Sequence, residues 1–248
     1  MRVRTNVIIL VIAVSVTAIV GFIGVTTGRS LTSQASDAST KAADKICDPT
    51  DCHISEGKRP ENCACRYSVV LVEFGNSELN LTNVQNGVGF NLDSEGHGKQ
   101  RVSWTAANSA GAFLYLDRNT NKKVDNGLEL FSNSTDQVPT SGVEPNGLLS
   151  LARQDRAELG GNGDGVIDSQ DAVFTKLRLW QDLNHNGISE PGELRTLKDA
   201  GIDSISLDYK RLEHVDQWGN LIRYNTDVFG ANHQKLGRAY DVVLLPAL

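Results

Sequence analysis

The sequence lacks an excess of basic residues. Its 248 residues include 24 Lys and Arg against 30 Asp and Glu, and the formal net charge is −6. A nucleic-acid surface needs clustered Lys and Arg to neutralise phosphates. The composition therefore argues against a nucleic-acid partner. The acidic balance suits cation binding instead, because uncompensated carboxylates in loops would repel one another.

The sequence also lacks the short motifs that carry much hydrolytic and phosphate chemistry. It contains no H-E-x-x-H, no G-x-S-x-G and no glycine-rich loop able to cradle a phosphate. These absences give no basis for catalysis, and we expect a protein that is not an enzyme. One histidine, His185, is expected to point to solvent. The five histidines are scattered, and no two stand at helical spacing: His53, His97, His185, His214 and His233.

Cysteine is scarce and confined to one segment, residues 46–66. The four cysteines are Cys47, Cys52, Cys63 and Cys65. In an exported chain an even count predicts two disulfides, for which three connectivities exist. Cys63 and Cys65 stand too close to pair with each other, so each is expected to bond to Cys47 or Cys52. A zinc site that includes His53 is the alternative, but the cysteine spacing does not match the usual C-x2-C pairs.

One long hydrophobic run stands near the N-terminus. Residues 6–25 are almost wholly apolar and follow the basic stretch MRVR. A secretory signal has about 7–15 apolar residues, whereas a spanning helix needs about 20. We therefore expect residues 1–28 to be a signal anchor or, if cleavage occurs near 33–35, a signal peptide. Arg2 and Arg4 favour a cytoplasmic N-terminus. The rest would then be extracytoplasmic, in the cell envelope, anchored through this hydrophobic helix or secreted.

The remainder of the chain divides into a linker and one folded domain. Residues 29–45 are small and polar without periodicity, which indicates a linker. Residues 67–248 are expected to form an α+β domain, in which short helices bracket loops and residues 203–248 are β-rich. Residues 216–220 supply a hairpin turn. Strands are predicted at 68–74, 87–92, 100–104, 203–211, 220–229 and 239–245, and helices at 148–154, 170–177 and 192–201.

The segment DLNHNGISEPGEL, which begins at Asp182, places oxygen-bearing side chains at regular offsets. Calcium takes six to eight oxygens from a 12-residue loop that has Gly at position 6 and a carboxylate at position 12. Gly187 and Glu193 hold these two places. Ser189 stands at position 8, where such loops usually carry an aliphatic residue for pairing with another loop. The expected ligands in loop 182–193 are Asp182, Asn184, Asn186, the carbonyl of Ile188, Glu190 and Glu193.

A second loop, 160–171, repeats the first at a distance of 22 residues. The register agrees except at position 1, where Gly160 stands; the missing ligand would be Asp155, if DRAELGG folds back, or water. Ile167 at position 8 is the apolar residue that such loops use for pairing. The alternative is a turn before a helix capped by Asp168 or Ser169. The expected ligands are Asn162, Asp164, the carbonyl of Val166, Asp168 and Asp171.

A third loop, 117–129, departs from the pattern. Lys122 stands where Gly is usual, and the closing acid arrives one residue late, which the bend at Asn126 and Gly127 can absorb. A solvated Asn-rich turn is the alternative. Residues 91–98 carry further acids but no closing carboxylate, so a hairpin loop is expected there before a cation site. The expected ligands of loop 117–129 are Asp117, Asn119, Asn121, the carbonyl of Lys123, Asp125 and Glu129.

These stretches resemble a family of exported bacterial EF-hand-like proteins. The resemblance is carried by SWTAANSAGAFLYLDRNTNKKVDNGLELF, by GGNGDGVIDSQDAVFTKLRLWQDLNHNGISEPGELRTL and by the strand-rich tail, from about residue 69 to 245. Similar stretches accompany the calcium modules of RTX-type secreted proteins. The resemblance implies Ca2+ as the cofactor and an extracytoplasmic location. It implies little about what the protein does with the metal. Because the loops carry modest charge and extracellular modules of this kind bind weakly, we expect the calcium to be mainly structural or to present a binding surface.

A second resemblance concerns NGDGVIDSQDAVF, which is similar to the paired loops of dockerins. Dockerins bind cohesin modules, so a dockerin-like docking module is the alternative function.

The Asp48–Pro49 bond is of a kind known to be labile in some calcium-triggered self-cleaving modules. A lone dipeptide between cysteines does not by itself indicate an enzyme. The sequence identifies no protein partner.

Overall fold

The computed structural model describes residues 45–46, 63–64, 66–75, 78–92 and 98–247. The expected membrane segment and most of the linker lie outside these residues, as do the side chains of all four cysteines. Strands β1 (Lys45–Ile46) and β2 (Cys63–Ala64) pair in parallel. Within the described ranges, no helix combines the length and the apolar character that crossing a membrane requires.

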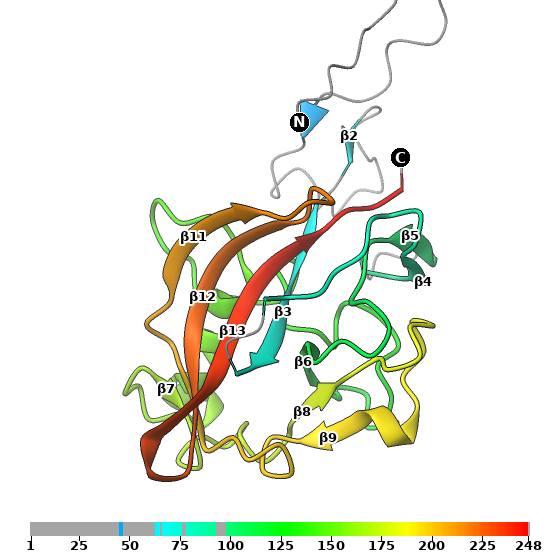
Figure 1. The fold of residues 1–248 in the computed structure, drawn as a ribbon. Coiled ribbons are helices and arrows are strands. Elements are labelled where there is room, and N and C mark those ends of the chain that lie inside the picture. Colours follow the sequence, from blue (N-terminus) through cyan, green and yellow to red (C-terminus); the bar gives the residue numbers. More distant parts are fainter. Residues whose placement is uncertain (1–44, 47–62, 65, 76–77, 93–97, 248) are drawn as a thin grey trace, which may run out of the picture. The chain divides into compact units, whose positions relative to one another are not determined.

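Nine antiparallel strands form one sheet within the described residues (Figure 1). Their order is β7–β10–β12–β13–β3–β6–β8–β9, and β11 pairs with the first half of β12. The sheet therefore joins strands that lie far apart in the sequence. The strands are β3 (Tyr67–Phe74), β6 (Ala112–Leu116), β7 (Val166–Ile167), β8 (Leu177–Trp180), β9 (Leu194–Thr196), β10 (Ser204–Ser206), β11 (Lys210–Val215), β12 (Leu221–Gly230) and β13 (Gln234–Leu244).

Strand β3 lies inside the sheet, between β13 and β6, and both of its faces are buried. Val70 and Val72 pack in a first core, which also holds side chains of helix α1 (Gly147–Ala152). Val69 and Leu71 pack in a second core on the other face, because side chains alternate along a strand. Burial on both faces explains the nearly continuous apolar run of this strand.

The second core contains most of the buried aromatic side chains. It lies under the hairpin of β4 (Val88–Phe90) and β5 (Gln100–Val102). Four of its side chains are Phe90, Trp104, Phe113 and Trp180, and contacting rings have centroids 4.3 to 5.6 Å apart. Such tilted contacts stabilise the core beyond the burial of surface alone. Trp104 and Trp180 lie where this core meets the predicted loop 182–193.

The expectation of an α+β fold is wrong, because the domain is mostly β. Helix α1 is the only α-helix in the described part of the chain, and it spans six residues. With the turn that follows it, α1 accounts for the helix predicted at 148–154. The helices predicted at 170–177 and 192–201 are absent: the first run forms turns that lead into β8, and the second forms the end of a 3-10 turn, then β9 and further turns. Pairing of β8 with β6 and β9 outweighs their local helical preference. The remaining helical turns are η2 (Arg153–Asp155), η3 (Ala157–Leu159), η4 (Pro191–Glu193) and η5 (Ala231–His233).

The strand predictions are confirmed for β3, β4, β5, β12 and β13. The run at 203–211 is divided between β10 and the start of β11. The hairpin turn at 216–220 is also confirmed, since the Asp216 carboxylate accepts the N–H groups of Trp218 and Asn220 between β11 and β12. Strands β6 and β8, which the sequence analysis did not predict, are the ones that lead into two of the predicted loops.

Candidate metal centres

Two of the three predicted loops begin where a strand of the sheet ends. β6 ends at Leu116, directly before Asp117, and β8 ends at Trp180, two residues before Asp182. Loop 160–171 begins after the short helix η3. Because β6 and β8 pair with each other inside the sheet, their buried side chains fix where loops 117–129 and 182–193 start.

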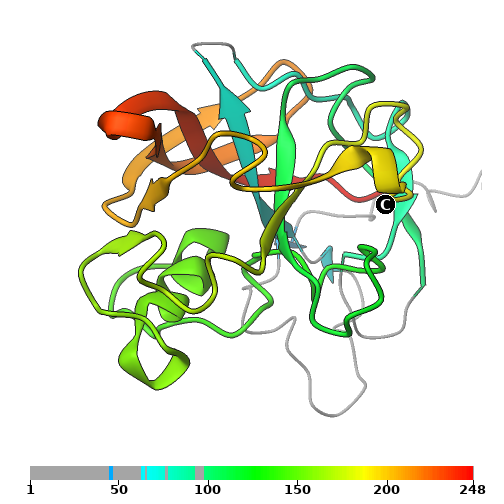
Figure 2. The same cartoon turned by 90° about the horizontal axis from the view of Figure 1, so that it is seen from below.

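Loops 160–171 and 182–193, which repeat in the sequence, are not neighbours in space. β7, inside the first, lies at one end of the sheet order, and β9, after the second, lies at the other. Figure 2 shows the lime-green segment around the first loop and the yellow segment around the second on opposite sides. The expectation that Ile167 pairs with a neighbouring loop is wrong. Ile167 pairs with Ile205 of β10 and packs in the first core.

All three loops share one backbone pattern. The chain takes the left-handed conformation at position 4 and again at position 6. Lys122 adopts it although Gly is usual there, at some cost in strain. Loop 117–129 therefore keeps the geometry of the other two despite its different sequence. The φ angles at position 4 are 62° for Thr120, 75° for Gly163 and 58° for His185, and those at position 6 are 63° for Lys122, 83° for Gly165 and 67° for Gly187.

The first acid of each loop binds backbone N–H groups inside the turn. Asp182 Oδ1 accepts the N–H of Asn186 at 3.1 Å, and its Oδ2 accepts that of Gly187 at 2.8 Å. Asp117 accepts the two equivalent N–H groups of its own loop, at 3.1 and 2.8 Å. These bonds hold the carboxylate at the centre of the turn, where a first ligand is needed.

Asp155 takes this place in loop 160–171. Its Oδ1 accepts the N–H of Gly163 at 2.8 Å, and its Oδ2 accepts that of Gly165 at 2.9 Å. The DRAELGG segment thus folds back, as one of the two alternatives for the missing acid requires. Gly161 permits the fold-back, because a Cβ at this residue would lie 2.1 Å from the carbonyl carbon of Asp155.

The closing acids are buried and point back into their loops. Each accepts the N–H of the residue at position 9, so the same hydrogen bond closes all three turns. Their exposed fractions are 3% for Glu129, 2% for Asp171 and 7% for Glu193. The bonds join Glu129 to Asp125 at 2.8 Å, Asp171 to Asp168 at 2.8 Å and Glu193 to Glu190 at 3.3 Å.

The asparagine amides donate to acids that are exposed (Asp125, Asp164) or half-buried (Glu190). In loop 117–129 the amide nitrogens of Asn119 and Asn121 donate to Asp125 Oδ2 at 2.9 and 2.5 Å, and these bonds hold the pKa of Asp125 below its usual value. Asn184 and Asn186 donate to the Glu190 carboxylate at 3.4 and 2.8 Å in the same way. In loop 160–171, Asn162 donates to Asp164 at 2.8 Å. Turning these amides would present their oxygens to a cation, since amide oxygen and nitrogen are nearly the same in shape.

Two tryptophans connect loop 182–193 to the second core. The indole N–H of Trp104 donates to Asp182 Oδ2 at 2.8 Å, and that of Trp180 donates to Glu193 Oε2 at 3.3 Å. The first and last acids of this loop are therefore positioned by rings that contact each other, with centroids 5.5 Å apart. A rigid second shell of this kind orients ligands before a metal binds.

Burial raises the pKa of the closing acids above its usual value. This holds for Glu129, Asp171 and Glu193, and for Glu193 a hydrogen bond from its protonated form to the Glu190 carboxylate adds to the effect of burial. Glu129 Oε1 and Glu190 Oε2 are buried and lack a hydrogen-bond partner among the described residues. Buried oxygens without partners cost free energy, and a cation would satisfy them.

Loops 117–129 and 182–193 meet at position 8. The N–H of Val124 donates to Ser189 Oγ at 2.8 Å, and this hydroxyl lies 3.5 Å from the Val124 carbonyl oxygen. Both residues are buried. The residue that breaks the aliphatic pattern is therefore the one that joins two loops, and Ser189 uses its side chain where paired loops usually use the backbone.

His185 does not point to solvent, contrary to expectation. Its Nδ1 lies 2.6 Å from the Thr105 carbonyl oxygen and its Nε2 lies 2.6 Å from that of Asn86. Asn86 precedes β4 and Thr105 follows β5, so the ring ties the loop to both ends of this hairpin. This contact was not predictable locally, because its partners are 99 and 80 residues away.

The predicted ligands divide into those that lie inside their turns and those that lie at the surface. The first and closing acids are mostly buried, whereas the asparagines and the carbonyl-bearing Lys123 and Ile188 are exposed, and Val166 is half-buried. No three Asp, Glu, His or Cys side chains among the described residues converge closely enough to hold a metal by themselves. Amide and carbonyl oxygens would have to complete each shell. Within the stretch 91–98, residues 93–97 lie outside the described part.

The fold and the loops define an antiparallel β protein that carries three acid- and amide-rich turns of one design. The chain belongs to the SPM domain family, whose model matches residues 70–245. It is also similar to the Iron-regulated protein FrpA of Neisseria meningitidis serogroup C, with 42% identity over 109 residues. This alignment covers 44% of the chain and 9% of FrpA, so the chain spans a small part of that relative.

Proposed function

We propose that this protein is an exported calcium-binding protein without catalytic activity, in which calcium is mainly structural. The observation that carries the proposal is the repeated scaffold of the three loops. Each has left-handed residues at positions 4 and 6, a first acid on the N–H groups of the turn and a buried closing acid. A solvated turn does not require two acids at fixed places, whereas a hard cation does.

The location rests on the N-terminal sequence. The apolar run at 6–25 and the resemblance to modules that accompany RTX-type secreted proteins support export to the cell envelope, with anchoring or secretion as outcomes. Extracellular calcium modules bind at about 10⁻⁴ to 10⁻³ M. Two of the loops use asparagine at positions 3 and 5, which lowers their charge and places them in this weak range.

The fold does not favour the alternative of a dockerin-like docking module. A dockerin presents helices that follow its two loops, but turns and β8 follow loop 160–171 and β9 follows loop 182–193. Protein docking therefore requires another surface.

The test is a calorimetric calcium titration of the full chain and of Glu193→Gln. Gln keeps the shape of the closing side chain but removes its charge, so we expect the affinity of loop 182–193 to fall at least about tenfold, as for loss of one charged ligand. Glu158→Gln is the matched control, because Glu158 is an exposed acid outside the loops. No heat in the unmodified chain at millimolar calcium, or equal isotherms for all three proteins, would refute the proposal.

Intact-mass measurement of the same calcium-treated samples tests the absence of catalysis. The Asp48–Pro49 bond is the place to inspect, since it precedes the matched domain. We expect one unbroken mass before and after calcium. Calcium-dependent fragments that end at Asp48 and begin at Pro49 would show a self-cleaving enzyme and overturn this part of the proposal, while leaving calcium binding intact.

A further inference from the structure

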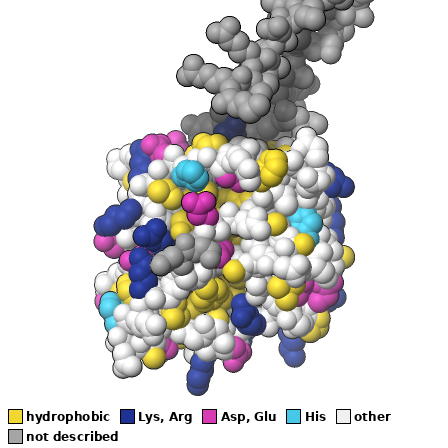
Figure 3. Space-filling model, in the orientation of Figure 1, with side chains coloured by type: hydrophobic (Ala, Val, Ile, Leu, Met, Phe, Trp, Pro, Cys, Tyr) yellow, Lys and Arg dark blue, Asp and Glu magenta, His cyan; other side chains and the backbone are white. Residues whose placement is uncertain are grey.

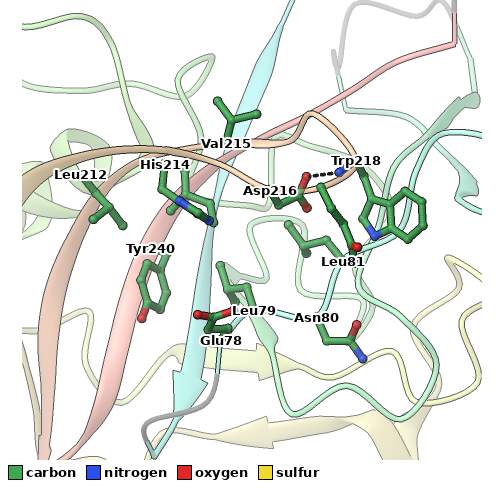
Figure 4. Close-up of a pocket in the computed structure, with 12 residues that line it drawn as sticks. Glu78, Leu79, Asn80, Leu81, Leu212, His214, Val215, Asp216, Trp218 and Tyr240 are labelled. Atoms are coloured by element: carbon green, nitrogen blue, oxygen red, sulfur yellow. Dashed lines mark hydrogen bonds between the residues drawn. The ribbon is translucent and has the colours of Figure 1, made fainter.

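A groove that none of the predicted calcium ligands lines lies between the β11–β12 hairpin and residues 78–81 (Figure 4). Its volume is about 510 Å³, within the range of about 300–1,000 Å³ that is usual for ligand pockets. Tyr240 of β13 and Ile222 of β12 line it together with side chains of the hairpin. The groove is thus built from the sheet and from a segment that crosses over it.

The rim of the groove is unusually apolar for a surface. Leu212, Val215 and Trp218 are exposed to 43%, 55% and 42%. They are three of the six exposed large hydrophobic side chains in the described part of the chain, and all three line this groove. Figure 3 shows hydrophobic side chains beside acidic ones on this face. Clustered exposed apolar side chains with a polar rim are typical of interaction sites.

The turn that carries Trp218 is firmly held. Asp216 Oδ1 accepts the N–H groups of Trp218 and Asn220 at 2.8 and 2.9 Å. The Asn220 side chain donates to the Thr82 carbonyl oxygen at 3.1 Å and accepts from Ser103 Oγ at 2.5 Å. Trp218 is therefore displayed on a turn that is fastened to neighbouring segments. A rigid display reduces the entropy that binding would cost.

The charge of the groove is one-sided. Its lining contains the carboxylates of Glu78 and Asp216 and no Lys or Arg. Neither acid forms an ion pair with another described residue. By contrast, nearby Asp208 pairs with Lys210 at 2.6 Å, and Glu213 pairs with Arg211. The Asp216 carboxylate also accepts three hydrogen bonds within its own turn, but these are from neutral N–H groups and leave its charge in place. An apolar groove with two acids and no Lys or Arg is complementary to a partner that is both apolar and basic.

We propose that this groove binds an extended peptide segment of a partner protein, in which an aliphatic residue stands next to Lys or Arg. The aliphatic side chain packs against Trp218, Leu212 and Val215. The basic side chain pairs with Glu78 or Asp216. Trp is among the residues that most often dominate binding energy at interfaces, so Trp218 is the principal contact. This proposal does not depend on the calcium proposal, because no predicted calcium ligand lines the groove.

The experiment uses the full chain in detergent and two labelled peptides, acetyl-Leu-Lys-Leu-Lys-Leu-amide and its Glu counterpart, with fluorescence anisotropy as the readout. The Lys peptide is expected to bind at least about tenfold more tightly than the Glu peptide. Trp218→Ala should weaken the Lys peptide about 10- to 30-fold, as for an interface hot spot. Glu78→Gln should weaken it about threefold and flatten its salt dependence.

Leu128→Ala is the matched control, since Leu128 is equally exposed, at 44%, but lies outside the groove. Its affinity for the Lys peptide should equal that of the unmodified chain. Absence of binding, equal affinity for both peptides or an unchanged affinity in Trp218→Ala would overturn the proposal. So would self-association that Trp218→Ala abolishes, which assigns the groove to a second copy. Quenching of Trp218 by brominated lipid in nanodiscs would assign it to the membrane and overturn the proposal as well.

Discussion

Asp155 occupies the place of the first acid in loop 160–171, although it lies outside the sequence motif of that loop. It stands before Gly160, yet it binds the N–H groups of Gly163 and Gly165 as Asp182 binds those of its own turn. Its carboxylate is buried, with 6% exposure. A count of loop positions alone would place Gly160 at the first ligand, where no side chain exists.

This geometry predicts opposite roles for residues 155 and 160. Asp155→Asn should weaken calcium binding by loop 160–171 about tenfold, because the first charged ligand is lost. Gly160→Asp should not tighten it, although the repeat pattern favours Asp there. Gly160 has a φ of 83°, and a Cβ on it would lie 2.7 Å from Ala172 Cβ. We expect Gly160→Asp to lower the thermal midpoint by several degrees.

Calorimetric titration in a Glu193→Gln background isolates this loop from the one at 182–193. Asp136→Asn serves as the control, since Asp136 forms only an exposed pair with Arg153 and such pairs contribute little. A tighter site in Gly160→Asp, or an unchanged one in Asp155→Asn, would mean that Asp155 does not occupy the first position.

At the scale of the elements, the contact between Val124 and Ser189 determines which two of the three loops touch each other. It joins 117–129 to 182–193, while β7 ties loop 160–171 to β10. If calcium binds as proposed, loops 117–129 and 182–193 should bind it cooperatively. Binding that orders loop 117–129 also fixes the Val124 N–H, and this N–H holds Ser189 of loop 182–193 in place. Coupling between sites is typically 1–3 kcal/mol, a factor of about 5–150 in affinity.

Ser189→Ala should remove most of this coupling. It leaves the buried Val124 N–H without its acceptor, at a cost of about 1–3 kcal/mol, but it changes no predicted ligand. Fitted calcium isotherms should lose their cooperativity while the number of sites stays the same. Ile167→Val, in the first core, should leave the cooperativity unchanged. Retained cooperativity in Ser189→Ala would show that the two loops communicate by another route.

The loops show what a sequence can and cannot predict at this level. The sequence predicted that the acids and asparagines of each loop share one turn, because that arrangement depends only on short, fixed spacing. The pairing partner of loop 182–193 was not found, because it depends on the order of strands in the sheet. The same is true of Trp104, whose indole meets Asp182 across 78 residues. Helices predicted at 170–177 and 192–201 failed for this reason too, since strand pairing overrode local preference.

For the whole molecule, one buried acid makes stability depend on pH. Glu73 on β3 is 2% exposed, and its Oε2 has no hydrogen-bond partner in the described part of the chain. Burial raises the pKa of Glu73 from 4.5 to about 7. Between pH 4.5 and 7 the Glu73 carboxyl is therefore mostly protonated in the folded state but mostly ionised in the unfolded chain. The free energy of unfolding should fall by about 3 kcal/mol as pH rises from 4.5 through 7, at about 1.4 kcal/mol for each pKa unit.

Glu73→Gln should remove this dependence, because Gln keeps the shape and cannot ionise. Urea unfolding should find the variant more stable than the unmodified chain by up to about 3 kcal/mol at pH 8 and nearly equal to it at pH 4.5. The difference between the two proteins cancels the contribution of the other acids. A variant that is less stable at pH 8 would show that the Glu73 carboxylate has a stabilising partner.

The position of β13 has a consequence for the moment at which the protein folds. This strand lies between β12 and β3 and pairs with β3 along its full length, from Leu244 beside Tyr67 to Gly237 beside Phe74. During synthesis β3 emerges long before its partner, so it cannot complete its pairing until residues 234–244 have also emerged. Pairing of such distant segments is slow. A chain that threads through an export channel would therefore still be open, and it would close into its sheet only on the far side.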